Sequence, residues 1–337
     1  MTTSSAPGKI ILFGEHAVVY GRPALAVPVM QVHADVEVSA STRPGIWIDA
    51  PDIDLHAELN TLPSDHPIAA VIHNFLFLAR VPHPQPLSQR ERGAKLPDLA
   101  IRITSTIPVA SGLGSGAAVT VALVRALSSH LGHPMPDEEI NAFAFEIEKL
   151  HHGTPSGIDN TVVTYARPVY FVKGQPIETF AVGKPFTIVI GDSGLPAPTR
   201  ESVGDVRKLW EADRAKWEEV FDEVGEVVKQ AKQAIEIGKP ALPKERRDDV
   251  SEVERWKNLG ELMDRNHALL QKMTVSSPEL DGLVSAAREA GALGAKMSGG
   301  GRGGNMIALS EAEEVESVSE ALLQAGAKRV IVSTIGR

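Results

Sequence analysis

The sequence PVASGLGSGAA, residues 108–118, places Gly112, Gly114 and Gly116 between two segments of regular structure. Residues 100–104 have the β-branched, alternating character of a strand, and residues 117–127 are apolar nearly all round, as in a buried helix. Closely spaced glycines at such a turn let backbone N–H groups converge on an anion at the helix N-terminus. The stretch therefore predicts a phosphate-binding loop.

Two common nucleotide motifs are excluded for this loop. A Walker loop needs Gly-Lys-Ser/Thr after four intervening residues, and a dinucleotide fingerprint needs a downstream acid for the ribose; neither is present. A tight strand-to-helix turn that binds nothing is the simplest alternative.

Earlier in the chain, APGKIILFGEHAVVYG at residues 6–21 contains a short apolar run, residues 10–13, which predicts a strand. Lys9 comes just before this strand, and Glu15 and His16 come just after it. A lone lysine is usually solvated, but the flanking glycine and the buried strand favour a functional position. The two strand ends are thus expected to present a lysine and an acid–imidazole pair.

A third polar cluster is EKLHHGTPSGID, residues 148–159, at the end of a helix predicted to begin near Asp137 and to end at Gly153. Glu148 and His152 are one helical turn apart, and the following loop delivers Asp159. Phosphoryl transfer needs one carboxylate for Mg²⁺ and another near the acceptor hydroxyl, and this cluster supplies both. An ordinary helix C-terminus is one alternative. Zinc is another, although the histidine spacing differs from known helical zinc sites.

The C-terminal half predicts a second domain. Amphipathic helices are expected at residues 206–237, 253–273 and 278–290, with a polar break at 240–249. The glycine run KMSGGGRGGN, residues 296–305, then precedes a strand–helix–strand pattern. This run is either a flexible turn or a place where backbone approaches a ligand or the first glycine loop closely. Residues 81–95 predict a solvated surface loop, with a basic phosphate-binding lid as the alternative.

Size and composition limit the possible functions. A length of 337 residues suits two domains, and 43% hydrophobic with 23% charged residues is typical of a globular protein. The net charge of -9 argues against broad nucleic-acid binding. The absence of cysteine excludes disulfides and thiol chemistry. The polar, uncharged start and an interrupted apolar run predict neither a signal peptide nor a membrane span, so a cytoplasmic location is expected.

Together, residues 6–21, 108–118 and 296–305 resemble the three motifs of the GHMP small-molecule kinases, and the resemblance extends over nearly the whole chain. It implies an α+β, two-domain GHMP kinase fold with the active site between the domains. Residues 1–183 would form an N-terminal domain similar to ribosomal protein S5 domain 2, and residues 184–337 a ferredoxin-like C-terminal domain.

The sequences GEHAVVYG and HGTPSGID resemble the branch of this family that phosphorylates mevalonate more than the galactokinases, homoserine kinases or diphosphomevalonate decarboxylases. The resemblance implies ATP-dependent phosphorylation of the C5 hydroxyl of mevalonate, giving 5-phosphomevalonate and ADP in isoprenoid biosynthesis. ATP is then the cosubstrate, Mg²⁺ the cofactor, and the family suggests a homodimer.

The resemblance also implies roles for individual residues. Asp159 is the catalytic carboxylate with Lys9 as its partner, and Glu148 and Ser115 are the metal ligands. The acceptor-site residues are Glu15, His16, His152 and Thr199. The ATP-binding residues are Pro108, Ser111, Gly112, Leu113, Gly114, Ser115, Gly116 and Ala117.

Three positions depart from the family pattern. Gly116 replaces a serine associated with magnesium, so Ser115 or water must take that role, and Arg302 replaces a glycine, where it would add a phosphate contact or narrow the loop. Residues 192–199 lack the usual basic residues, for which Arg200 is a substitute. The alternatives are therefore a GHMP kinase for phosphomevalonate, homoserine or a sugar, and an ATP-binding sensor without catalysis.

Overall fold

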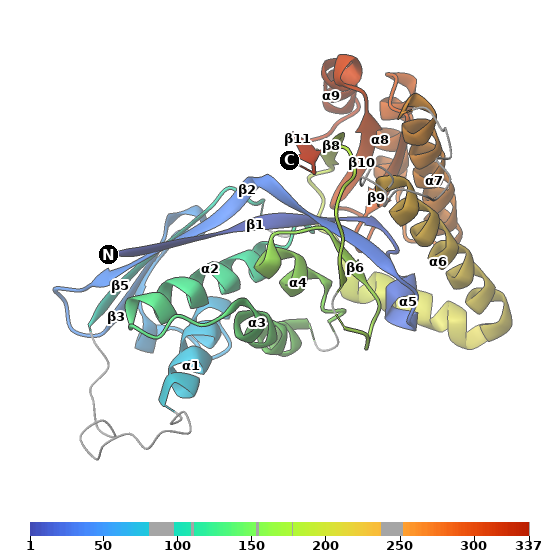
Figure 1. Cartoon of the computed structure of the whole chain (residues 1–337). Helices are drawn as coiled ribbons and strands as arrows, with labels where there is room; N and C mark the ends of the chain where they lie inside the picture. The colour runs from blue at the N-terminus through green and yellow to red at the C-terminus, as the bar shows by residue number, and fades with distance from the viewer. Residues whose placement is uncertain (81–97, 109–110, 153–154, 177, 237–251, 337) are drawn as a thin grey trace, which may run out of the picture.

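The structure is a computed structural model that describes residues 1–80, 98–108, 111–152, 155–176, 178–236 and 252–336. The predicted surface loop at 81–95 and the polar break at 240–249 lie outside these residues. Figure 1 shows an elongated molecule in which a long sheet over helices meets a second sheet with its own helices.

The N-terminal half is built on one twisted sheet. Within the described residues its strand order is β4-β3-β5-β2-β6-β7, with β1 paired antiparallel to β2. The strands are β1 (Thr2–Phe13), β2 (Ala24–Ala40), β3 (Ile46–Ala50), β4 (Leu55–Glu58), β5 (Leu99–Ser105), β6 (Val169–Phe171) and β7 (Glu178–Thr179). The helices are α1 (Pro67–Arg80), α2 (Ser115–His130), α3 (Asp137–His152) and α4 (Ile158–Tyr165), which lie on one face of the sheet (Figure 1).

Helix α2 is the centre of this half because it is apolar on nearly every side. Its alanines, valines and leucines are buried, and it packs against β1 and β2 on one side and against α1, α3 and α4 on the other. The predicted buried helix after the glycine loop is therefore confirmed. Its N-terminus faces the strand that carries Lys9.

The C-terminal half contains a four-stranded antiparallel sheet of order β11-β8-β10-β9. The strands are β8 (Phe186–Asp192), β9 (Gly294–Ser298), β10 (Asn305–Ser310) and β11 (Arg329–Ile335), and the helices are α5 (Thr199–Ala212), α6 (Arg214–Glu236), α7 (Glu252–Lys272), α8 (Pro278–Glu289) and α9 (Val315–Gln324). When the helices between β8 and β9 are taken as one crossover, this is the βαββαβ arrangement of a ferredoxin-like domain. The predicted C-terminal fold is confirmed.

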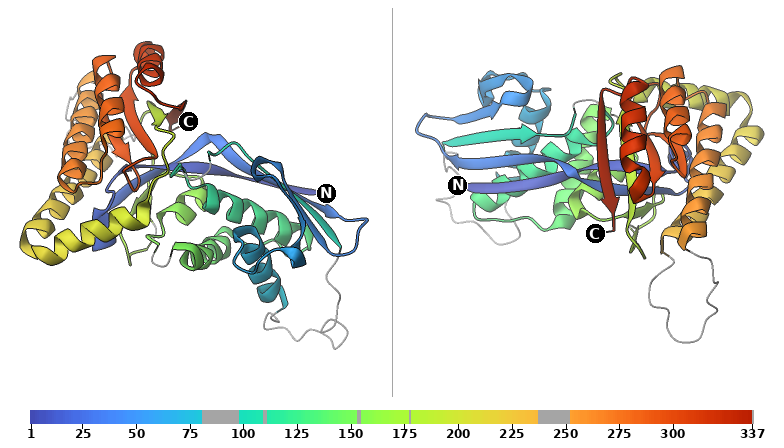
Figure 2. Two further views of the ribbon diagram at one scale, coloured as in Figure 1. Left: turned by 180° about the vertical axis from the view of Figure 1, so that it is seen from behind. Right: turned by 90° about the horizontal axis from the view of Figure 1, so that it is seen from above.

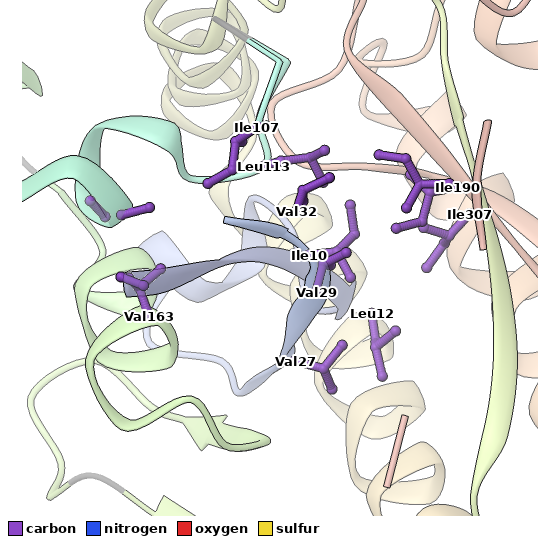
Figure 3. Packing of buried hydrophobic residues seen from close by; sticks show 14 of the residues in the cluster. Ile10, Leu12, Val27, Val29, Val32, Ile107, Leu113, Val163, Ile190 and Ile307 are labelled. Carbon is purple, nitrogen blue, oxygen red and sulfur yellow. The ribbon is translucent and has the colours of Figure 1, made fainter. Parts of the chain in front are cut away.

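The two halves share one apolar core. A single cluster of buried side chains runs from Ile10 and Leu113 in the N-terminal half to Ile190 and Ile307 in the second sheet (Figure 3). The long strands β1 and β2 reach beneath the C-terminal sheet, as both views in Figure 2 show. Burial of this shared surface fixes the position of one half against the other.

One sequence prediction about a strand is wrong in detail. The first strand begins at Thr2, so Lys9 lies inside it rather than before it, because the polar residues 2–5 pair with β2 as an edge. Farther along the chain, Tyr165 belongs to α4, and β6 covers only Val169–Phe171. Ala166, with φ 48°, ends the helix in a left-handed conformation.

The first sheet ends with β7 and the second begins with β8, so we keep the division at residues 183 and 184 as a proposal. No helix among the described residues is long and apolar enough to cross a membrane.

Candidate active site

Lys9 and Asp159 face each other. The ammonium Nζ of Lys9 lies 2.9 Å from Oδ1 of Asp159, and the two side chains are 5% and 31% exposed. Lys9 comes from the middle of β1, whereas Asp159 lies in the first turn of α4, 150 positions later in the sequence. A buried lysine held by a half-exposed carboxylate provides a fixed positive charge beside a group that solvent or substrate can reach.

An irregular step in the β1–β2 ladder brings Lys9 to the glycine loop. Pro7 pairs with His33 but Gly8 pairs with Val29, so β2 has three extra residues at this point. The backbone N–H of Lys9 donates to the carbonyl of Leu113, at 2.9 Å. A Cβ on Gly8 would lie 2.9 Å from Cγ2 of Val32, so glycine is needed for this close approach.

The glycine loop opens onto this lysine. Gly114 has φ 75° and stands at the N-cap of α2, where no side chain caps the helix. The first backbone N–H groups of α2 are consequently available to an anion, and the helix dipole favours negative charge there. On the other side of the loop, the Ser111 hydroxyl donates to the Pro108 carbonyl and the Asn305 amide donates to the Ser111 carbonyl.

Gly114→Ala is expected to weaken anion binding at the loop by about tenfold or more, because a non-glycine residue at positive φ costs roughly 1–2 kcal/mol and its Cβ would lie 2.8 Å from Cγ of Lys9. Gly282→Ala is the matched control, since a Cβ there meets no heavy atom within 4 Å and the residue lies in α8, outside this loop. Calorimetric titration with inorganic pyrophosphate compares the two. An equal loss of affinity in both variants would show that the positive φ of Gly114 and its closeness to Lys9 do not matter for binding.

Glu148 lies close to this pair. The pKa of Glu148 is raised to about 8, chiefly by burial and next by the charge of Asp159, while Lys9 opposes both effects. Two carboxylates beside one ammonium leave oxygen donors of the kind that Mg²⁺ prefers. These residues fit a magnesium ion. Ser115, the first residue of α2, stays a prediction as its second ligand.

Glu15 and His16 form a tight, buried turn after β1. Gly14 has φ 98°, and a Cβ there would collide with the backbone of Pro23 and Ala24. His16 is itself at φ 61°. Its Nε2 lies 3.1 Å from the carbonyl of Gly300; because a carbonyl only accepts, Nε2 carries the proton. Burial lowers the pKa of His16 to about 4, so the ring is neutral and Nδ1 is an acceptor, without a partner among the described residues.

The third glycine run meets this turn from the other domain. A Cβ on Gly300 would lie 2.4 Å from the hydroxyl oxygen of Thr199, so Thr199 and His16 both contact the backbone of Gly300. Arg200, the proposed substitute for a basic residue, is exposed in the first turn of α5. The side chain of His152 lies outside the described part of the chain, and its assignment stays a prediction.

Arg302 is turned toward α5. Its Nη1 lies 2.7 Å from Oδ2 of Asp205, and its Nε donates to the carbonyl of Thr274. The arginine therefore ties the third glycine run to that helix. Lys296, at the start of the same run, forms a buried ion pair with Glu15. In the sequence, Lys296 stands out only as the first residue of the glycine run 296–305. No local pattern points to Glu15 as its partner.

Transfer of a phosphoryl group relies on positioning and on charge stabilisation, and the charged side chains and glycine loop at the junction of the two domains can supply both. The comparisons with known proteins agree. The family models described as GHMP kinases N terminal domain and GHMP kinases C terminal match residues 86–167 and 245–328. The protein is an ATP-dependent small-molecule kinase.

More specifically, the chain belongs to the mevalonate kinase branch of the GHMP family. It is 36% identical to a mevalonate kinase of Thermococcus gammatolerans, over 97% of this chain and 94% of that protein. It is 31% identical to a mevalonate kinase of Saccharolobus solfataricus, over 99% of this chain and 96% of that protein.

Solved structures give the same result. A crystal structure of L. major mevalonate kinase in complex with R-mevalonate is 28% identical, with a TM-score of 0.78 over 99% of this chain and 96% of that one. Mevalonate kinase from Staphylococcus aureus MRSA252 is 27% identical, with a TM-score of 0.68. The match covers 100% of this chain and 99% of that one. The predicted two-domain GHMP kinase fold is confirmed over the full length.

Proposed function

We propose that this chain transfers the γ-phosphoryl group of ATP to the C5 hydroxyl of mevalonate, giving 5-phosphomevalonate and ADP. The observation that carries the proposal is the contact between Lys9 and Asp159 beside the glycine loop. The full-length similarity to mevalonate kinases, one of them solved with R-mevalonate, supports this choice of acceptor.

In the proposed reaction the acceptor oxygen attacks the γ-phosphorus while the bond from that phosphorus to the β,γ-bridging oxygen breaks. Asp159 accepts the hydroxyl proton. Lys9 keeps the Asp159 carboxylate in place and stabilises the charge on the transferring group. Backbone N–H groups at the start of α2 hold the phosphates. Because catalysis comes from position and charge, no covalent intermediate on the protein is needed.

Glu15 and His16 suit an acceptor that carries hydroxyl groups. Nδ1 of the neutral His16 ring and one carboxylate oxygen of Glu15 are buried acceptor atoms without partners among the described residues. An unpaired buried acceptor costs about 1–3 kcal/mol, and a hydroxyl donor would remove that cost. Thr199 stays in the proposed acceptor site through its contact with Gly300.

Mg²⁺ is part of the proposal, with Glu148 and Ser115 as its protein ligands. When bound, the ion would neutralise phosphate charge. The raised pKa of Glu148 supports this role, because a bound cation would offset the burial and the charge of Asp159 that raise it.

Gly116→Ser is expected to lower the Mg²⁺ concentration required for half-maximal rate severalfold. It restores the hydroxyl that the family usually has, and the site has room, since a Cβ at Gly116 meets no atom within 4 Å. A magnesium titration of the rate at saturating ATP measures the effect. An unchanged midpoint would mean that this position does not contribute a ligand.

The proposed activity is tested by ADP release with a panel of acceptors: mevalonate, phosphomevalonate, homoserine and galactose. We expect turnover with mevalonate alone, and ³¹P–¹H correlation should place the phosphate on C5. ADP release with another acceptor would reassign the substrate. Binding of ATP without ADP production would favour the sensor alternative.

A cytoplasmic location and a homodimer complete the proposal. The family resemblance is the support for the dimer. Sedimentation equilibrium of the purified chain would measure its mass, and cell fractionation would locate the native protein.

A further inference from the structure

Lys296 is a fully buried charge at the junction of the two domains. It lies in β9, is 0% exposed, and donates through Nζ to the carboxylate of Glu15 and, at 2.6 Å, to the carbonyl of Met297. Glu15, at 1% exposure, belongs to the turn after β1, so the pair joins residues 281 positions apart.

Such a pair is not explained by stability alone. Removing two charges from water costs several kcal/mol per ion, and a well-packed apolar pair of similar volume often stabilises a fold as well or better. Ser298 also bridges the junction, through a hydrogen bond from its hydroxyl to the carbonyl of Ile11. The two domains are therefore also joined by a neutral contact, and the presence of a buried ion pair between Lys296 and Glu15 needs a different explanation.

The reason lies in the strained turn that the pair anchors. His16 is a non-glycine residue at φ 61° and ψ -50°, a conformation that costs about 1–3 kcal/mol and persists only when its surroundings hold it. The strand β9 and the glycine run after it hold this turn at two adjacent points: Lys296 binds Glu15, and the Gly300 carbonyl accepts from His16.

The pair also leaves one carboxylate oxygen unused. Lys296 binds Oε1 of Glu15, whereas Oε2 is buried without a partner among the described residues. Lys296 thereby fixes the direction of the carboxylate and leaves Oε2 as the atom that can accept from a ligand.

We propose that Lys296 is a positioning residue for the acceptor site: from the C-terminal domain it orients Glu15 and, through the shared turn, His16 toward the small hydroxyl-bearing acceptor. This inference rests on the proposed acceptor role of Glu15 and His16. It adds that the N-terminal domain cannot hold these two residues in place without the charge on β9.

Lys296→Met tests the proposal. The variant keeps the length of the side chain and removes its charge, so we expect the KM for mevalonate to rise at least about tenfold while the KM for ATP stays within twofold. Because an unpaired buried carboxylate also destabilises the fold, rates are measured well below the melting temperature of each variant.

Two further variants separate positioning from stability. Glu15→Gln/Lys296→Met removes both charges, so we expect its melting temperature to recover toward that of the wild type while the KM for mevalonate stays high. Ser298→Ala, the matched control, removes a neutral bond across the same junction and should lower stability without moving that KM.

Recovery of both stability and acceptor KM in the double variant would overturn the proposal, and so would an unchanged acceptor KM in Lys296→Met. A wild-type protein that fails to phosphorylate mevalonate but accepts another hydroxyl compound would contradict the proposed function instead. In that case the same KM comparison with the accepted compound still decides the role of Lys296.

Discussion

Asp159→Asn is expected to reduce kcat by about a thousandfold, the middle of the range for loss of a general base. Asparagine preserves the size of the side chain and can still accept a hydrogen bond from Lys9, but its amide cannot take the proton of the acceptor hydroxyl. Affinity for ATP should change little, because in the proposed site the phosphates bind the backbone at the start of α2 and not Asp159.

A coupled ADP assay gives kcat, and calorimetric titration with ATP gives affinity. The control is Asp222→Asn, the same chemical change at an ion pair with Arg22 on the surface, where Asp222 is 70% exposed. Turnover of Asp159→Asn equal to that of the control would remove Asp159 from the mechanism.

Lys9→Met is expected to lower kcat by about a hundredfold to a thousandfold, the loss typical of one electrostatic stabiliser in a buried site. Methionine fills a similar volume, so the packing against Gly114 is kept while the charge is lost. Asp159 and Glu148 would then face each other without the ammonium that now opposes their repulsion.

The pKa of Glu148 should rise further in Lys9→Met, because Lys9 is the group that lowers it. We therefore expect the rate of this variant to need more Mg²⁺ as well as to be slower at saturation. Lys9→Arg keeps the charge on a bulkier side chain and should retain more activity than Lys9→Met. Equal activity in the two variants would show that charge is not what Lys9 contributes.

Much of the proposed site could be predicted because its residues lie in short, local patterns. A strand, three glycines and an apolar helix predict the proposed phosphate loop, and the confirmed buried helix α2 follows from its apolar residues. One helical turn separates Glu148 from the end of α3, so the sequence could predict a carboxylate cluster there.

Other features depend on tertiary contacts that no local pattern contains. The polar start of β1 resembles a disordered terminus, yet it is ordered by pairing with β2, which placed Lys9 inside a strand. The valines of α4 favour a strand by propensity, but burial against β1 and β2 holds them in a helix. The partnership of Lys296 with Glu15 exists only once the domains meet.

The irregular step between Pro7 and Gly8 has a further consequence for the start of the chain. The strand is divided there into an outer and an inner piece with separate registers, because residues 30–32 of β2 separate the two sets of partners. A change in the register of the outer piece can be accommodated at this step. The hydrogen bond from the Lys9 N–H to the Leu113 carbonyl fixes the inner piece. Lys9, the proposed catalytic lysine, is thereby separated from changes in the register of residues 2–7.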